Sequence, residues 1–284
     1  MPSLIILKAR PHRTECHVVG AIAVAIAIWA SPVSAQIQQP RYQPGWPCNG
    51  TVDPAYVTTA EATGGTVFLV GPSESAGKMA EMTASNRHPE VVFRASASRA
   101  ADGLHEFDVP LDSTIESAYF FISLQCLEGL SIIDPSGEEV RADVPGVEVH
   151  SFAAIRLLTV AAPTPGLWKI RVAGHGFLSV IVKAKTDLRL ANVTFADAQN
   201  ALKRTAQRLE VTLEGAASDV SFHAASAGAD VLKLLNLELE QQKDTYRTYG
   251  GAITPPGVHF RVVVAGTDPN GFRFQRVHKR LIVK

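Results

Sequence analysis

The chain has 284 residues, of which 27 are Lys or Arg and 27 are Asp or Glu, so its formal net charge is zero. This length is enough for two ordinary domains. A balanced charge gives no electrostatic footprint for nucleic acid or for an anionic membrane surface, so we expect no nucleic-acid partner.

Residues 1–35 have the layout of a secretory signal peptide. Three basic residues precede an apolar run from Val18 to Ala30, and the residues at Val33 and Ala35 suit a cleavage site. The run is shorter than the roughly 20 apolar residues of a membrane-spanning helix. We therefore expect cleavage near Ala35, a secreted or periplasmic location, and no stable membrane insertion. A retained membrane anchor is the alternative.

Two cysteines remain once the signal peptide, which contains Cys16, is removed. They are Cys48 and Cys126, and in an oxidising compartment two such residues form a natural pair. A bridge would close a loop of about 78 residues and remove on the order of 4 kcal/mol of denatured-state freedom. We expect a Cys48–Cys126 disulfide, with two separate buried thiols as the alternative.

Residues 36–52 are rich in Pro and Gln without periodicity, which is typical of a leader or linker. Asp53 and Pro54 then suit the start of a short helix, which we expect to end at Gly64. The apolar run Thr66–Val70 is typical of a buried strand.

From Pro89 onward the pattern changes to short apolar strands separated by turns. The turn signals recur about every 8–12 residues, which is the spacing of an all-β sandwich. We expect a first β-sandwich module over residues 53–187, which includes the short helix and strand. The predicted strands are Val91–Phe93, Leu104–Val109, Thr114–Leu124, Leu130–Ile133, Phe152–Val160, Leu167–Val172 and Phe177–Val182.

A second β pattern covers residues 188–284. Its segment Arg208–Leu213 alternates, with Leu209, Val211 and Leu213 on one face. Six or seven strands in about 95 residues fit an immunoglobulin-like sandwich, here without a disulfide because this half contains no Cys. The predicted fold class is mainly β: two antiparallel β-sandwich modules, the second immunoglobulin-like, with a short helical N-terminal remnant.

Four stretches carry a resemblance to known families. AEATGGTVFLV resembles the last helix and last strand of a von Willebrand factor type A domain, where a helix ends in Thr-Gly-Gly before the chain enters the sheet. Three further stretches are similar to the region that follows the A domain in hemicentin-like and bacterial exported proteins. They are DSTIESAYFFISLQCLEGLSIIDPSGEEV, PTPGLWKIRVAG and GTDPNGFRFQRVHKRLIV. The resemblance spans residues 55–284. It implies an extracellular chain of β-sandwich modules that serves binding or adhesion.

The metal site of the A domain is not expected in this chain. That site needs an Asp-x-Ser-x-Ser cluster at the end of a first strand, and the residues before Tyr56 offer no such strand. The nearest look-alike, Asp112-Ser113-Thr114, lies at the entry to a predicted β strand. Metal-dependent adhesion is therefore not implied.

No catalytic residues are predicted. A second short helix, expected over Ser75–Ser85, contains a Ser-x-x-Lys pattern at Ser75 and Lys78. The Ser-Asp-Asn and Lys-Thr-Gly elements that such acyl-enzymes also need are missing from the sequence. We therefore interpret the pattern as an exposed helix start.

No metal ligands and no cofactor are predicted either. The histidines are scattered, without a His-Glu-x-x-His or Cys-x-x-Cys pattern. In a strand, His105 would face away from Glu106 and Asp108, which favours a surface pair of carboxylates. The segment Asp268–Gly271 is interpreted as a hairpin turn, with weak calcium binding as the alternative.

Trp168 shares its predicted strand face with Ile170 and Val172, which favours packing in the core over stacking on a sugar. The preferred hypothesis is an exported, non-enzymatic binding or adhesion protein whose partner is an extracellular or cell-envelope protein. The alternative is an exported carbohydrate-binding or hydrolase-accessory module with a glycan as its ligand.

Overall fold

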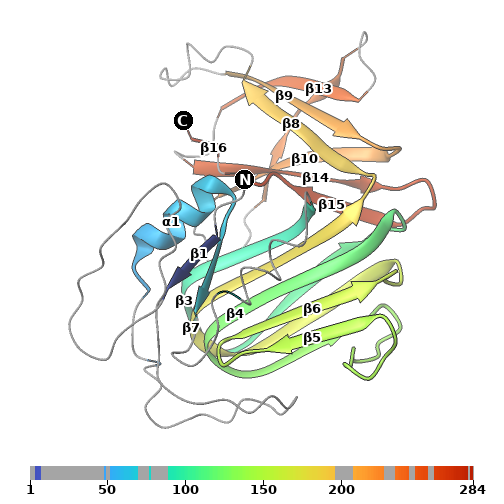
Figure 1. Ribbon diagram of the computed structural model, residues 1–284. Coiled ribbons are helices and arrows are strands. Elements are labelled where there is room, and N and C mark those ends of the chain that lie inside the picture. The colour runs from blue at the N-terminus through green and yellow to red at the C-terminus, as the bar shows by residue number, and fades with distance from the viewer. Residues whose placement is uncertain are drawn as a thin grey trace.

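The computed structural model describes residues 4–7, 48, 52–69, 77, 89–195, 207–226, 234–242, 247–254, 259–280 and 282–283. The predicted mainly β fold class is confirmed, because the described chain consists of several antiparallel sheets and one short helix, α1 (Pro54–Thr63) (Figure 1). The predicted cleavage site, the leader apart from Cys48 and Val52, and the side chains of Ser75 and Lys78 lie outside the described residues. The boundaries at 53–187 and 188–284 remain a prediction. None of the described helical residues forms a helix long and apolar enough to cross a membrane.

The first module is built on a five-stranded antiparallel sheet with the order β3-β7-β4-β6-β5. Its strands are β3 (Glu90–Leu111), β4 (Ile115–Ile133), β5 (Val147–Ser151), β6 (Ile155–Ala161) and β7 (Gly166–Thr186). The sequence predicted two short strands in place of each of β3, β4 and β7, and this prediction was wrong (Figure 1). The expected turn residues form bulges instead, and a bulge bends a strand without ending its pairing.

Register shifts of the three long strands coincide at one level of the sheet, in the middle of the strands. The pairing of β3 with β7 shifts register between Ala97 and Gly103, and that of β4 with β7 shifts between Leu124 and Gly129. We call this level the bend. Each long strand changes direction here, so that its two halves come to face each other across the core.

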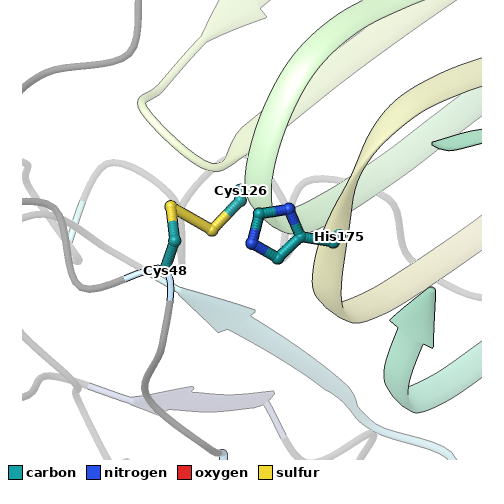
Figure 2. Close-up of side chains that lie close together, drawn as sticks. All are labelled: Cys48, Cys126 and His175. Atoms are coloured by element: carbon teal, nitrogen blue, oxygen red, sulfur yellow. A yellow bond between two sulfur atoms is a disulfide. The ribbon is translucent and has the colours of Figure 1, made fainter. Parts of the chain in front are cut away.

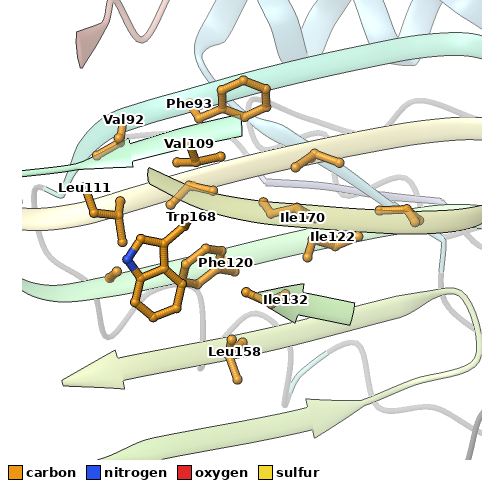
Figure 3. Close-up of a cluster of buried hydrophobic side chains, with 14 of the residues drawn as sticks. Val92, Phe93, Val109, Leu111, Phe120, Ile122, Ile132, Leu158, Trp168 and Ile170 are labelled. Carbon is orange, nitrogen blue, oxygen red and sulfur yellow. The ribbon is translucent and has the colours of Figure 1, made fainter. Parts of the chain in front are cut away.

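A continuous apolar core fills the space between the two halves of the bent sheet (Figure 3). The rings of Phe93 and Phe107, one from each half of β3, lie 5.7 Å apart. Trp168 rests against Phe120 at the same centroid distance of 5.7 Å and is only 2% exposed. Its indole N–H donates to the Thr164 carbonyl at 2.8 Å. The predicted core position of Trp168 is therefore confirmed, and the bent sheet forms a sandwich.

The segment of α1 and β2 (Thr66–Leu69) covers part of the outer face of the bent sheet. The Asp53 side chain caps the start of α1 by accepting the backbone N–H of Ala55, and Gly64 ends the helix with a φ of 74°. β2 is buried at every position and pairs in parallel with β1 (Leu4–Leu7). Phe68 packs on the outer face of the sheet in a second apolar cluster. The short helix and the strand predicted here are confirmed.

The second module is a pair of antiparallel sheets that face each other, with the orders β12-β13-β9-β8 and β11-β10-β14-β15, and with β16 paired to β14. Their strands are β8 (Arg189–Phe195), β9 (Gln207–Glu214), β10 (Ser218–Ser226), β11 (Leu234–Leu237), β12 (Glu240–Gln241), β13 (Thr248–Ile253), β14 (His259–Thr267), β15 (Arg273–Val277) and β16 (Ile282–Val283). The alternation predicted for β9 is confirmed, because Leu209, Val211 and Leu213 are buried between the two sheets.

Buried ion pairs fasten the second module to the first, and we call this contact region the seam. Arg276 of β15 and Asp112, next to the end of β3, are both fully buried, with 2.7 Å between Nη1 and Oδ2. Arg276 also donates to the Leu188 carbonyl at 2.7 Å and to the Thr186 hydroxyl at 3.1 Å. These partners offset the high desolvation cost of a buried guanidinium.

A second buried ion-pair group at the seam places Glu61 of α1 between Arg94 of β3 and Arg261 of β14. The Nη2 of Arg94 lies 3.0 Å from Oε1 of Glu61, Arg261 pairs with Oε2, and the Ser96 hydroxyl donates to Oε1 at 3.0 Å. Burial alone would raise the pKa of Glu61, but the charges of Arg94 and Arg261 outweigh burial and lower this pKa below its ordinary value. The Glu61 carboxylate is therefore held in its charged form.

Candidate functional site at the bend

The predicted disulfide is present and lies at the bend. Cys48 and Cys126 are bonded, with their Cα atoms 5.4 Å apart and a sequence separation of 78. Cys126 belongs to β4 and lies within the register shift between Leu124 and Gly129, where it is buried. The bridge therefore ties the chain before α1 to the bent sheet.

The strand alternation predicted for the segment after His105 is confirmed. Glu106 accepts a hydrogen bond from Nε of Arg171 at 2.6 Å, and both side chains are nearly half exposed. Phe107 points the other way and packs against the core. The Nε2 of His105 lies 3.0 Å from the Ala101 carbonyl oxygen, so this imidazole is engaged with the backbone rather than with the two carboxylates.

Asp268, considered as a weak calcium ligand, closes a turn. Its Oδ1 accepts the backbone N–H groups of Asn270 and Phe272, each at 2.9 Å. Its Oδ2 accepts the backbone N–H of Ser113 at 2.8 Å and the Ser113 hydroxyl at 2.6 Å. Burial raises the pKa of Asp268, but these hydrogen bonds outweigh burial and lower it. Both carboxylate oxygens are thus engaged within the protein, as the hairpin-turn interpretation requires.

The look-alike of the A-domain metal cluster also has a structural role. One carboxylate oxygen of Asp112 accepts a hydrogen bond from Arg276, and the other accepts from the backbone N–H and the hydroxyl of Thr114. Ser113 in turn holds Asp268. These residues join the end of β3 to the second module.

The bend carries a histidine that the sequence placed in a turn. His175 lies inside β7, between Gly174 with a φ of 132° and Gly176 with a φ of 92°. A Cβ atom on Gly174 would lie 1.8 Å from the Cys126 carbonyl oxygen, and one on Gly176 would lie 2.7 Å from Oε1 of Gln125. The two glycines therefore let β7 approach β4 closely while presenting the imidazole between them. The Gly-His-Gly pattern is the signal that could have located this position.

Three side chains with metal-ligating atoms converge at the bend, and we call them the bend cluster. They are Asp102 of β3, Glu128 of β4 and His175 of β7, and one ligand atom from each lies within 4.8 Å of the other two. The Nδ1 of His175 is 3.7 Å from Oδ1 of Asp102, which is beyond hydrogen-bond distance. This Nδ1 is shielded from solvent and has no hydrogen-bond partner within the described part of the chain.

The disulfide stands beside the imidazole and forms one wall of the site (Figure 2). The sulfur atoms of Cys48 and Cys126 lie within 4.8 Å of a ring nitrogen of His175. The thiolate is the form of cysteine that binds metals, so the bonded sulfurs are poor ligands. The bend therefore combines a covalent cross-link with a nitrogen and two carboxylates, a set that suits a cation or a hydrogen-bond donor.

Comparison with known proteins shows a similarity for part of the first module. The family model described as "Hemicentin galactose-binding domain-like" matches residues 91–187, which is less than half of the chain. No curated protein matches the chain. Four chains of solved structures match. One is the crystal structure of Bacillus licheniformis lipase BlEst2 in propeptide form, at 11% identity and a TM-score of 0.36.

The likeness to the lipase is too weak to support an inference about fold or activity. The alignment covers 72% of this chain and 45% of the lipase chain, so this chain spans less than half of that protein's length. The family match is more informative, because its limits coincide with the long strands of the bent sheet. Residues 91–187 form a hemicentin-like β-sandwich region.

Proposed function

We propose that this chain is an exported, non-enzymatic binding protein of the adhesion type. The observation that carries the proposal is the match of the hemicentin galactose-binding domain-like family to residues 91–187, which make up the bent sandwich. The signal-peptide layout of residues 1–35 supports export. The partner that we favour is an extracellular or cell-envelope protein.

We place the contact with this partner on the half of the bent sheet formed by residues 104–110 of β3 and 167–173 of β7, and we call the exposed face of this half the outer layer. In this layer β3 and β7 pair Leu104 with Ala173 at one end and Pro110 with Leu167 at the other. Leu104 is 61% exposed and Leu167 is 53% exposed. Between them lies the salt bridge of Glu106 and Arg171. Asp108 and Lys169 also pair on this face, so the layer offers charged groups with an exposed leucine at each end, and arginine among exposed apolar side chains is enriched at protein interfaces.

The opposite half of the bent sheet differs, because α1, β2 and parts of the second module pack against its outer face. Its apolar residues are therefore used inside the molecule. The outer layer around Leu104 and Leu167 has no such cover within the described residues, which supports its assignment to an external partner.

A pull-down from cell-envelope extract with the exported chain tests the proposal. We expect a reproducible partner whose capture is lost in Leu104→Asp and Leu167→Asp. Val144→Asp is the matched control, because Val144 is 43% exposed but lies outside this layer, and it should retain the partner. A lack of any reproducible partner, or capture that survives both variants, would contradict the proposal.

A glycan is the second candidate ligand, and the description of the matched family as galactose-binding domain-like favours it. Trp168 is buried in the core, so a glycan would contact the outer layer or the bend instead. Binding to galactose-containing glycans on an array, abolished by the Leu104 and Leu167 variants, would favour this candidate. Retention by both variants would argue against a glycan on the outer layer.

We also infer that α1 and β2 are a remnant of a von Willebrand factor A-type helix and strand. The local order supports this, because α1 ends at Gly64 and the chain enters the buried strand β2 at Thr66, as in the quoted stretch AEATGGTVFLV. An A-domain protein encoded beside this chain and co-purifying with it would support a two-part adhesin. The reverse result, with no association between the two, would remove that interpretation.

A further inference from the structure

We propose that the bend cluster binds a divalent transition-metal ion of the Zn²⁺ class through Asp102, Glu128 and His175. This site goes beyond the proposed binding function and does not depend on the identity of the partner. It rests on the position of the three side chains, on an unpartnered nitrogen and on the rigidity of the surrounding strands.

The spacing of the ligand atoms fits a bound ion. Zn²⁺ lies about 2.1 Å from histidine nitrogen and from carboxylate oxygen. An ion at that distance from both His175 Nδ1 and Asp102 Oδ1, which are 3.7 Å apart, would make an angle of about 124° with these two atoms, an angle that fits a distorted tetrahedral site. A carboxylate oxygen of Glu128 lies within 4.8 Å of a ring nitrogen of His175 and of a carboxylate oxygen of Asp102, so a rotation of this exposed side chain brings it to the same centre.

The Nδ1 of His175 gives independent support. It is excluded from solvent, yet it makes no hydrogen bond in the described part of the chain. A buried polar atom without a partner is uncommon and unfavourable. Asp102 is near enough to favour a shared ion but too far to accept a hydrogen bond from this nitrogen. A metal ion would supply the missing partner.

The strands around the cluster hold its members in place. Each of the three residues lies at or beside a register shift of β3, β4 or β7, and bulges of this kind redirect side chains at functional sites. Gly174 and Gly176 fix the path of β7 on both sides of His175. The Cys48–Cys126 bridge then restrains β4 from the other side. A prearranged site of this kind loses little freedom when it binds an ion.

The ligand set also indicates the class of ion. One imidazole with two carboxylates favours Zn²⁺ and related transition metals over Mg²⁺ and Ca²⁺, which prefer oxygen ligands alone. Two carboxylates balance the charge of a divalent ion. The Asp102 side chain is 80% exposed, so water would complete the coordination. The site is thus exchangeable rather than closed.

Titration of the oxidised, metal-stripped chain with ZnCl₂ tests the site, with calorimetry and thermal unfolding as the two measurements. We expect one ion per chain and a higher melting temperature on saturation. His175→Ala and Glu128→Gln should each weaken binding by at least about tenfold. The matched control is His150→Ala, because His150 forms an exposed pair with Glu148 at 2.7 Å in β5. This control should bind as the unmodified chain does.

Two results would overturn the metal site: no stoichiometric binding by the unmodified chain, or binding that persists in both bend variants. Circular dichroism of Glu128→Gln keeps the test valid if His175→Ala fails to fold, because Glu128 is exposed. Titration with Co²⁺ adds a spectroscopic readout, since visible absorption bands report nitrogen and oxygen coordination directly. Because no partner is present in these titrations, their failure would leave the proposed binding function untouched.

Discussion

The seam and the bend use the same kinds of side chain in opposite ways. At the seam, Asp112 and Arg276 are both fully buried, and the guanidinium donates to a carboxylate, a hydroxyl and a carbonyl. At the bend, Asp102 is 80% exposed and His175 is 34% exposed, and the Nδ1 atom of His175 has no partner among the described residues. Charges of the first kind hold modules together. Charges of the second kind remain available to a ligand.

The two regions also differ in what stabilises them. The seam depends on polar contacts between segments that are far apart in sequence, such as the 3.0 Å hydrogen bond from Nη2 of Arg261 to the Glu61 carbonyl, which joins residues 200 positions apart. The bend depends on backbone bulges and on one covalent bridge. Loss of a single seam residue should therefore destabilise the whole chain, whereas loss of a polar residue at the bend should alter binding alone.

The largest effect is expected for Asp112→Ala. This change leaves Arg276 buried without its carboxylate, and breaking a buried pair lowers the free energy of unfolding by up to about 5 kcal/mol. Urea unfolding followed by tryptophan fluorescence measures the loss. A loss below about 1 kcal/mol, the size seen for exposed pairs, would show that the seam does not differ from a surface contact.

The next effect is expected for the double change Cys48→Ser and Cys126→Ser. Removing a bridge that spans 78 residues should lower the free energy of unfolding by about 4 kcal/mol, because the denatured chain gains freedom. The same urea experiment measures it. An unchanged midpoint would mean that the bulges hold the bend without the bridge.

A third prediction uses Glu61, whose pKa is lower in the folded chain than in the unfolded one. Its contribution to stability is therefore complete above the unfolded pKa and is lost as the pH falls through the lower folded value. Glu61→Gln should lower the free energy of unfolding by about 3 kcal/mol at neutral pH. The difference from the unmodified chain should shrink at acid pH. Urea unfolding from neutral to acid pH checks this, and a constant difference would contradict it.

The smallest effect on stability is expected for Asp102→Asn in the absence of metal. Asp102 is a surface carboxylate, so the free energy of unfolding should change by less than about 0.5 kcal/mol. Unfolding in the presence of a chelator measures this. A loss of more than about 2 kcal/mol would mean that the bend cluster is a structural ion pair, and the contrast with the seam would fail.

Much of the fold follows from the apolar pattern alone. The alternation of Leu209, Val211 and Leu213 predicted the strand β9. The apolar neighbours of Trp168 on its strand face predicted that this residue lies in the core. The continuity of the long strands could not be predicted, because the residues that favour a turn also favour a bulge. Gly174-His175-Gly176 is compatible with a turn that ends a strand and with a bulge inside one. The pairing of this segment with β4 makes it a bulge.

The two sites were predictable to different degrees. Cys48 and Cys126 could be paired because only two cysteines follow the predicted signal peptide. The bend cluster could not be found, because Asp102, Glu128 and His175 lie on three strands and meet only through their register shifts. The burial of Arg276 was equally hidden, since arginine is ordinarily a surface residue.

The missing side chain at Gly174 has a consequence for anyone who redesigns this scaffold. Even a methyl group there would collide with the carbonyl oxygen of Cys126, only 1.8 Å away. The close approach of β7 to β4 at the bend therefore requires that residue 174 has no Cβ atom. Sequence libraries that vary this sandwich should keep position 174 constant, because a substitution there would push β7 away from its neighbouring strand β4 before any surface change could be assessed.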